Sequence, residues 1–533
     1  MSMALIDQLP ALPVLLPAAT AVLLLLVGDH GGGQHNLQRQ LLSGRIAIGS
    51  ALLGLVLAIQ LFLQASDGNL MVYRMGEWPA PFGIVLVIDR LAAMMVLLTS
   101  LIALPVLLYA SGGWAGNGRY FYALFQFQLM GLNGAFVTGD LFNLFVFFEV
   151  LLIASYVLML HGLGRERLRV GVHYVVLNLC ASALFLIGLA LLYALTGTLN
   201  MADLAVRVPL VTGPDAIVLQ VAALLLLVVF GFKAALAPLS VWLPATYAAA
   251  SAPVAALFAI MTKVGVYAIW RVHGVIFGAG AGTSAMLVEP LLLPLAVLTC
   301  AIGVLGVLAA QTLPRLVAWL TVASVGTVLL AIGLFGAQAW SAALYYLAHS
   351  TLTVAGLFLL VELVAAQRGE VGSRIEPASP VAQPTMLGLM LLLAAASCVG
   401  LPPLPGFIGK LMLLQASSGH VHAGVVWSIV LLAGFLSLLG LARAGSTLFW
   451  NVRSDMPSGA SGASAPLVTA TGFLLALSVA MSVFAAPLQR YTAAAAEQLL
   501  DRKAYADAVL GEQGAQGART ARPYTGKSGE GKP

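Results

Sequence analysis

Long apolar runs separated by short polar stretches make up most of the chain. A helix that crosses the hydrocarbon layer of a membrane needs about 20 mostly apolar residues. On this rule the sequence predicts about fourteen spans, near residues 10–27, 46–64, 84–109, 120–138, 141–161, 170–194, 216–244, 254–277, 286–309, 315–335, 341–364, 385–416, 424–448 and 466–486. A membrane β-barrel would show alternating segments of about ten residues instead. The prediction is therefore an all-α polytopic membrane protein.

Proline and glycine interrupt two of these spans. The seventh contains Pro238 and Pro244, and the twelfth contains the run Gly-Leu-Pro-Pro-Leu-Pro-Gly at residues 400–406. Proline removes a backbone donor and clashes with the preceding turn, so both helices are expected to break within the membrane. Two broken helices at corresponding places in two halves are typical of transporters with inverted repeats. The offset of five spans predicts two five-helix repeats, spans 4–8 and 9–13. Kinks that serve only packing are the alternative.

The same pattern predicts a division of the chain. Residues 1–115 hold the first three helices, 116–280 the first repeat, 281–450 the second repeat, and 451–490 the last helix. Residues 491–533 are rich in glycine, alanine and basic side chains and are expected to form a polar, flexible tail.

Composition agrees with a membrane protein. Hydrophobic residues make up 61% of the 533 residues and charged residues only 8%, with a mean hydropathy of +0.99. A soluble domain is about 25% charged, so a water-soluble globule is excluded. The three cysteines, Cys180, Cys300 and Cys398, lie in apolar runs without metal-ligand spacing. No cleavable signal peptide, metal site, cofactor motif or nucleic-acid partner is predicted.

Charged loops predict the orientation. With an even number of spans, eleven arginines fall in loops on the side opposite the termini, among them Arg119, Arg165 and Arg368. The terminal side carries only Arg74, Arg207 and Arg271 before the basic tail. Because basic loops stay in the cytoplasm, both termini are expected on the periplasmic side of a bacterial inner membrane.

Five ionisable residues lie well inside predicted spans or at their breaks, on five separate helices: Glu149, Lys233, Lys263, His349 and Lys410. Charges at this depth cost several kcal/mol, so each is a candidate functional group. Burial disfavours the charge of a lysine and a nearby carboxylate favours it. A lysine beside Glu149 is therefore expected to act as a proton switch, with Lys263 and His349 as relays and Lys410 as the terminal site.

Structural explanations stay open for each of these residues. Glu149 and Lys233 could form a buried ion pair with a purely structural role. Lys263 could likewise have a structural role. A histidine such as His349 is also common in a satisfied core, and a lysine such as Lys410 can extend to the membrane interface.

Other polar residues near the span ends are weaker candidates. Asp140 is either a helix N-cap or a cation-collecting mouth, and His173 either the start of a relay or a helix end. Asp89 and Arg90 are expected to form a local pair, and Glu362 to reach the lipid headgroups.

Four motifs resemble the D-type subunit of Mrp-type (Pha or Mnh) multisubunit cation/proton antiporters. They are GDLFNLFVFFEVLLIASY from Gly139 to Tyr156, LTGTLNMAD from Leu195 to Asp203, KAALAPLSVWLPATY from Lys233 to Tyr247, and GLPPLPGFIGK from Gly400 to Lys410. The superfamily also contains the antiporter-like subunits of respiratory complex I. The resemblance covers nearly the whole chain up to about residue 495.

The resemblance implies fourteen helices with two inverted five-helix repeats. It also implies that Glu149 and Lys233 form a charged pair, that Lys263 is the central relay, and that Lys410 is the outer site. His349 matches a histidine of many relatives, which often carry a lysine one turn later. In this sequence His349 is followed by Ser350 and by other hydroxyl or apolar residues, with no lysine. His349 and bound water are therefore expected to take over the relay role of that lysine.

The expected function is a proton-translocating subunit of a Na⁺/H⁺ or K⁺/H⁺ antiporter, a secondary transporter rather than an enzyme. The partners implied by the resemblance are the A-type and C-type antiporter subunits and small membrane subunits, together with lipids. The alternative is a proton-pumping subunit of a complex I-type NADH:quinone oxidoreductase. A third possibility, an inert scaffold, is disfavoured because apolar residues would fill the buried positions at lower cost.

Overall fold

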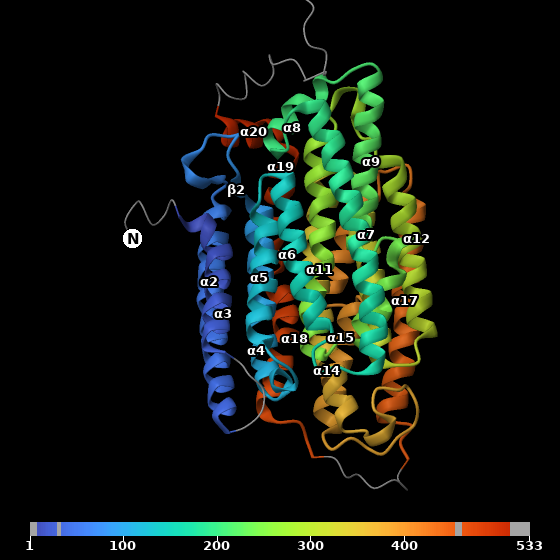
Figure 1. Cartoon of the computed structure of the whole chain (residues 1–533). Helices are drawn as coiled ribbons and strands as arrows, with labels where there is room; N and C mark the ends of the chain where they lie inside the picture. Colours follow the sequence, from blue (N-terminus) through green and yellow to red (C-terminus); the bar gives the residue numbers. More distant parts are fainter. Residues whose placement is uncertain (1–7, 29–33, 454–460, 512–533) are drawn as a thin grey trace, which may run out of the picture.

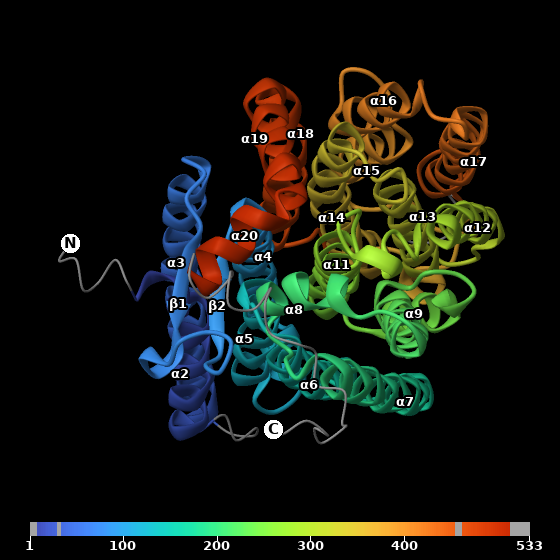
Figure 2. The same cartoon turned by 90° about the horizontal axis from the view of Figure 1, so that it is seen from above.

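The computed structural model describes residues 8–28, 34–453 and 461–511. They form a bundle of long helices that run roughly side by side (Figure 1), with short elements at one end. Seen along the bundle, α2 and α3 lie at one edge and α12 and α17 at the other (Figure 2). The fold is thus the predicted helical membrane bundle.

The helices are connected mostly by short turns. In the first half of the chain they are α2 (Leu12–Val27), α3 (Gln34–Ser66), α4 (Arg90–Ser111), α5 (Phe121–Val137), α6 (Leu141–Met159), α7 (Arg165–Thr196), α8 (Met201–Arg207), α9 (Pro214–Ala234), α10 (Trp242–Ala249) and α11 (Ala252–Ile269). In the second half they are α12 (Glu289–Ala309), α13 (Leu313–Ile332), α14 (Ala337–Ala366), α15 (Pro384–Val399), α16 (Pro405–Ser417), α17 (Ala423–Phe449), α18 (Ala465–Val483), α19 (Ala485–Leu500) and α20 (Arg502–Leu510). Short 3₁₀ turns (η1, Leu9–Ala11; η2, Met75–Glu77; η3, Trp114–Asn117; η4, Val208–Leu210; η5, Leu239–Val241; η7, Gly282–Ser284; η8, Gly369–Val371) and a π-helix (η6, Trp270–Ile276) complete the helical part.

Twelve helical segments in the described part of the chain are long and apolar enough to cross a membrane. Two predicted spans are not among them. One is α5, which has 17 residues, and the other is the segment divided into α15 and α16. The count of fourteen spans therefore remains a prediction.

Both predicted helix breaks are present. After α9 the chain turns at Ala235, whose φ of 62° is left-handed, and Pro238 precedes η5 and α10. After α15 it turns at Gly400, which has a φ of 90°, and Pro405 opens α16. A left-handed residue ends a helix, and proline prevents its continuation.

One end of the bundle carries a small sheet and both described chain ends. Strands β1 (Met71–Arg74) and β2 (Val85–Ile88) are antiparallel, with Met71 opposite Ile88 and Arg74 opposite Val85. Near the start of the chain, η1 packs against both strands, and Arg74 donates to the Val509 carbonyl of α20 at 3.4 Å. The first and last described elements therefore lie at the same end (Figure 1).

The prediction of a flexible tail from residue 491 is wrong for residues 491–510. These residues belong to two packed helices, α19 and α20. In α19, the Tyr491 hydroxyl donates to the Arg90 carbonyl at 2.8 Å, and Thr492 contacts Ser341 of α14 at 2.9 Å. The guanidinium of Arg502 binds the Ala205 carbonyl of α8. Residues 512–533 of the expected tail lie outside the described part of the chain.

Helices α11 and α14 form the centre of the bundle. In the apolar stretch of each helix, 94% of the α11 segment and 89% of α14 are buried inside the protein. The corresponding share for α3 is 22%. In Figure 2 they lie between the α4–α6 group and the α12–α13 group. Lys263 on α11 and His349 on α14 are therefore enclosed by protein.

Candidate functional site

Glu149 and Lys233 are joined through helix α7. The Ser182 hydroxyl donates to the Glu149 carboxylate, and the Lys233 ammonium donates to Asn178 Oδ1 at 3.1 Å. Asn178 and Ser182 are four residues apart on α7, so they lie on one helix face. The carboxylate and the ammonium are bridged by one turn of α7.

A direct ion pair between Glu149 and Lys233 is not formed. In the described ranges, the ion pairs within 4.0 Å are Arg207–Asp203, Arg271–Asp89 and Arg374–Glu376. The Lys233 ammonium instead lies 5.8 Å from the ring centre of Phe148, the residue before Glu149. Glu149 and Lys233 are therefore close to each other but not in direct contact.

Lys263 is completely buried on α11, and its ammonium donates to Thr262 Oγ1 at 3.3 Å. Two residues later, Gly265 allows α11 to approach the broken end of α9. A Cβ on Gly265 would lie 2.4 Å from the Ala234 nitrogen and 2.8 Å from the Lys233 carbonyl carbon. The glycine therefore holds the segments that carry Lys233 and Lys263 against each other.

His349 and Lys410 line one small cavity of about 30 Å³. His349 Nδ1 lies 3.2 Å from Ser478 Oγ and 3.3 Å from Thr353 Oγ1. A cavity of this size has room for one or two waters. The structure thus brings these two predicted residues together around a space that suits a bridging water.

Lys410 occupies the second helix break. Its ammonium donates to the carbonyls of Cys398 at 3.1 Å and Val399 at 2.7 Å, which end α15. The last carbonyls of a helix lack partners within the helix and carry its negative dipole end. The broken helix therefore supplies a binding place for the positive charge of the half-buried Lys410 side chain.

Together the five residues follow a path across the bundle. Glu149 and Lys233 lie on one side, on α6 and α9, and His349 and Lys410 on the other, on α14 and α16. Lys263 lies on α11, which packs against both α9 and α14.

Asp140 and His173 do not join this path. Asp140 is the N-cap of α6, with Oδ1 accepting from the Asn143 amide at 2.9 Å, and burial raises the pKa of its carboxyl group. His173 is exposed on α7. The capping role of Asp140 is therefore the one the structure shows.

Sequence reasoning missed a buried ion pair at the terminal end of the bundle. The Asp89 carboxylate contacts the Arg271 guanidinium at 2.6 Å through each of its oxygens, rather than pairing with Arg90. Arg271 also donates to the Tyr267 hydroxyl at 2.9 Å. Asp89 and Arg271 are 182 positions apart, so only the adjacent arginine was visible as a partner.

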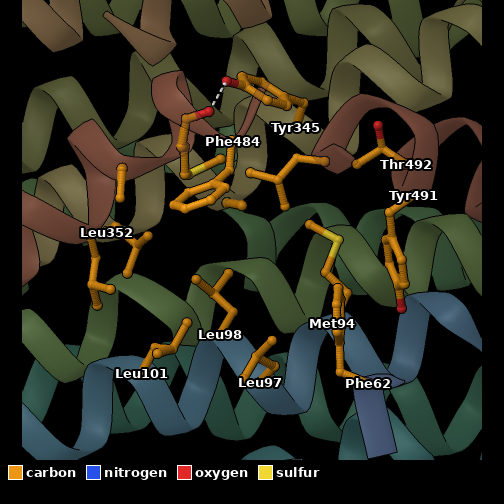
Figure 3. Close-up of a pocket in the computed structure, with 15 residues that line it drawn as sticks. Phe62, Met94, Leu97, Leu98, Leu101, Tyr345, Leu352, Phe484, Tyr491 and Thr492 are labelled. Atoms are coloured by element: carbon orange, nitrogen blue, oxygen red, sulfur yellow. Dashed lines mark hydrogen bonds between the residues drawn. The ribbon is translucent and has the colours of Figure 1, made fainter. Parts of the chain in front are cut away.

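A separate cavity of about 300 Å³ is lined almost entirely by apolar side chains of α3, α4, α14, α18 and α19 (Figure 3). Its lining includes Met94, Leu98 and Phe484, and the Tyr345 hydroxyl there donates to the Met481 carbonyl at 2.9 Å. None of the five candidate residues lines this cavity.

Residues 138–440 match the family described as NADH:quinone oxidoreductase/Mrp antiporter, transmembrane. The chain belongs to this family. All five candidate residues lie within the matched region, and the resemblance inferred from the four motifs is confirmed.

Individual relatives cover nearly the whole chain. A protein of Rhizobium meliloti (strain 1021), named as the D-type subunit of a probable K⁺/H⁺ antiporter, is 39% identical over 544 residues, covering 95% of this chain and 98% of the relative. The D-type subunit of the Na⁺/H⁺ antiporter of Alkalihalophilus pseudofirmus is 37% identical, covering 95% and 100%. Among solved structures, one polypeptide of the Mrp complex from Dietzia sp. DQ12-45-1b is 26% identical with a TM-score of 0.82, covering 96% of this chain and all of that one.

Proposed function

We propose that this chain is the D-type subunit of a multisubunit monovalent cation/proton antiporter and that it moves protons through the bundle. The observation that carries the proposal is the row of ionisable side chains on α6, α9, α11, α14 and α16, of which Lys233, Lys263 and His349 are buried and Glu149 and Lys410 half-buried. The names of the relatives support antiport with K⁺ or Na⁺ over a quinone-driven pump. Such a chain is a component of a secondary transporter, with other antiporter subunits as partners.

The path runs from Glu149 through Ser182 and Asn178 to Lys233, and on to Lys263. From there it continues through His349 and the 30 Å³ cavity to Lys410. Each lysine has three N–H donors in its charged form. Lys233 and Lys263 each use one with a protein acceptor and Lys410 uses two, so each can also bind water that brings or removes a proton.

Two halves of the chain, 116–280 and 281–450, act as inverted repeats in this proposal. Each would contain five of the predicted spans, and the fourth of each is the interrupted one, α9–α10 and α15–α16. Lys233 lies in the last turn of α9, before the first break, and the Lys410 ammonium binds the end of α15 at the second. The repeats thus supply equivalent charge sites on the two sides of Lys263.

Both termini lie on the periplasmic side in this proposal, in a bacterial inner membrane. The first and last described elements share one end of the bundle, and the start of α7 and the end of α14, near which Arg167 and Arg368 lie, are at the other end. Basic loops are retained in the cytoplasm, so the arginine-rich end is the cytoplasmic one.

The test is cation-dependent proton movement in membrane vesicles that contain the assembled complex. Glu149→Gln and Lys233→Met should abolish exchange while the complex still assembles. His173→Ala, on the exposed face of α7, is the matched control and should leave the rate unchanged. Full exchange in both relay variants would overturn the proposal.

A further inference from the structure

Glu362 is an acidic residue of α14 that the relay does not use. It lies one turn before the end of the helix, at the arginine-rich end of the bundle, and it is half-buried rather than extended into the headgroups. The Trp114 indole N–H donates to one carboxylate oxygen, and the other oxygen, Oε2, is buried without a hydrogen-bond partner among the described residues. A buried polar atom left in this way requires an explanation.

The nearby Arg167 does not neutralise Glu362 through an ion pair. Its guanidinium lies 5.3 Å from the centre of the Trp114 ring. Its N–H groups are directed to the backbone, to the Ala249 carbonyl at 2.8 Å and the His161 carbonyl at 2.9 Å. Glu362 therefore has only neutral donors beside it, the Trp114 indole and the backbone N–H of Ala252, and the nearby positive charge of Arg167 is directed elsewhere.

Two cavities meet at Glu362. The outer cavity, of about 590 Å³, lies between the end of α4, η3, the end of α14 and the start of α18. The inner cavity, of about 200 Å³, lies between α7, the α10–α11 junction and α14. Glu362 and Trp114 line both cavities, so the carboxylate faces both spaces.

The inner cavity suits water. Its lining includes Ser251, whose hydroxyl is buried without a partner in the described structure, as is Glu362 Oε2. The rest of the lining is mostly apolar, but the space has room for water beside these two polar groups, and water there would satisfy both. The first turn of α11 also lines it, and the amide end of a helix favours negative charge.

Helix α11 connects the inner cavity with the central lysine of the relay. Ala255 of α11 lines it, and Lys263 follows eight residues later on the same helix. At 1.5 Å per residue this separation is about 12 Å along the axis. The carboxylate thus lies between the aqueous side of the arginine-rich end and the central lysine.

We propose that Glu362 is a proton-exchange group that connects the aqueous phase at the arginine-rich end with Lys263. The carboxylate takes one proton from a water in one cavity and gives one proton to a water in the other, so no co-reactant is needed. Trp114 positions the carboxylate between the two spaces. The role rests on the proposed antiport function, and it adds a further proton-carrying residue to it.

A spectroscopic test reports on this site without depending on transport. The indole that contacts Glu362 should change its fluorescence when the carboxylate gains a proton. The chain has 8 tryptophans, so the Trp114 signal is obtained in the purified complex as the difference between the wild type and Trp114→Phe. The signal should titrate with pH in the wild type and not in Glu362→Gln.

Other groups around Glu362 must be separated from it. Arg167 of α7, Tyr109 of α4 and Tyr247 of α10 line the two cavities, and the His161 ring contacts the Trp114 carbonyl. A Trp114 titration that persists in Glu362→Gln belongs to one of these groups and overturns the proposal. The absence of any Trp114 titration in the wild type also overturns it.

Exchange in vesicles supplies the second test. Glu362→Gln should lower the rate at least tenfold, and Glu362→Asp should restore part of it. Glu370→Gln, an exposed acid eight residues later, is the matched control and should have no effect. Trp114→Phe keeps the carboxylate but removes its donor, so exchange should persist with its pH dependence moved upward.

Failure of this inference is distinguishable from failure of the proposed function. If Glu149→Gln abolishes exchange and Glu362→Gln leaves it normal, Glu362 has no part in the proton path and only the inference is overturned. If both variants exchange normally, the relay itself is overturned.

Discussion

Asn178 and Ser182 lie one turn apart on α7, and together they connect the ammonium of Lys233 to the carboxylate of Glu149. Neither residue is ionisable, yet both hold an ionisable partner. Their amide and hydroxyl groups allow two opposite charges to share an apolar region without direct contact. The polar face of α7 is therefore part of the proposed relay.

Replacing Asn178 should uncouple Lys233 from Glu149. In Asn178→Leu the buried ammonium loses the amide oxygen that accepts from it, and an unsatisfied buried polar group costs about 1–3 kcal/mol. We expect roughly a tenfold loss of exchange with normal assembly, measured in vesicles with a pH-sensitive dye. Leu179→Ala, at the exposed neighbouring position, is the control. An unchanged rate in Asn178→Leu would show that Lys233 works without this bridge.

Lys410 should be needed for both transport and stability. Lys410→Met removes the donor that binds the Cys398 and Val399 carbonyls at the end of α15. We expect loss of proton-linked exchange and a lower thermal unfolding temperature of the complex. Normal exchange in this variant would mean that the path leaves the membrane elsewhere.

Gly406 should tolerate no side chain. A Cβ there would lie 1.9 Å from the Ser397 carbonyl oxygen and 2.9 Å from His349 Nε2. Gly406→Ala therefore forces the two sides of the second break apart. We expect this to lower the free energy of unfolding by about 1–3 kcal/mol. The expected result is a lower unfolding temperature and a loss of exchange. Gly419→Ala, where no atom lies within 4 Å, should match the wild type, and equal stability of the two variants would contradict the prediction.

Local chemistry predicted the helix breaks, and long-range packing decided the contacts. Pro238 and the prolines at 402–405 end helices through their own backbone restrictions, so both breaks were visible in the sequence. The bridge through Asn178 depends on how α7 packs between α6 and α9, which no local pattern encodes. Likewise, α19 has too little apolar character to be taken as a membrane span, yet Tyr491 and Thr492 pack against α4 and α14.

The Asp89–Arg271 pair should serve stability rather than proton movement. Asp89→Asn leaves a guanidinium buried at 3% exposure without its counter-charge, which costs about 3–5 kcal/mol. The unfolding temperature should fall markedly in this variant. The double variant Asp89→Asn, Arg271→Met removes both charges and should recover part of the loss. If the double variant were less stable than Asp89→Asn, the pair would contribute more than mutual neutralisation.

The isolated chain should insert in a membrane yet exchange no cations. Antiport requires a route for Na⁺ or K⁺ besides the proton path, and hard cations bind groups of oxygen ligands, often several carboxylates. Within residues 8–28, 34–453 and 461–511, no three His, Cys, Asp or Glu side chains lie close enough to hold a metal ion. The relay offers one acid, Glu149, held by a serine hydroxyl. We therefore expect purified chain in liposomes to show no cation-dependent proton movement with a pH-sensitive dye, whereas liposomes with the whole complex show it. Robust exchange by the chain alone would place the cation route within this polypeptide.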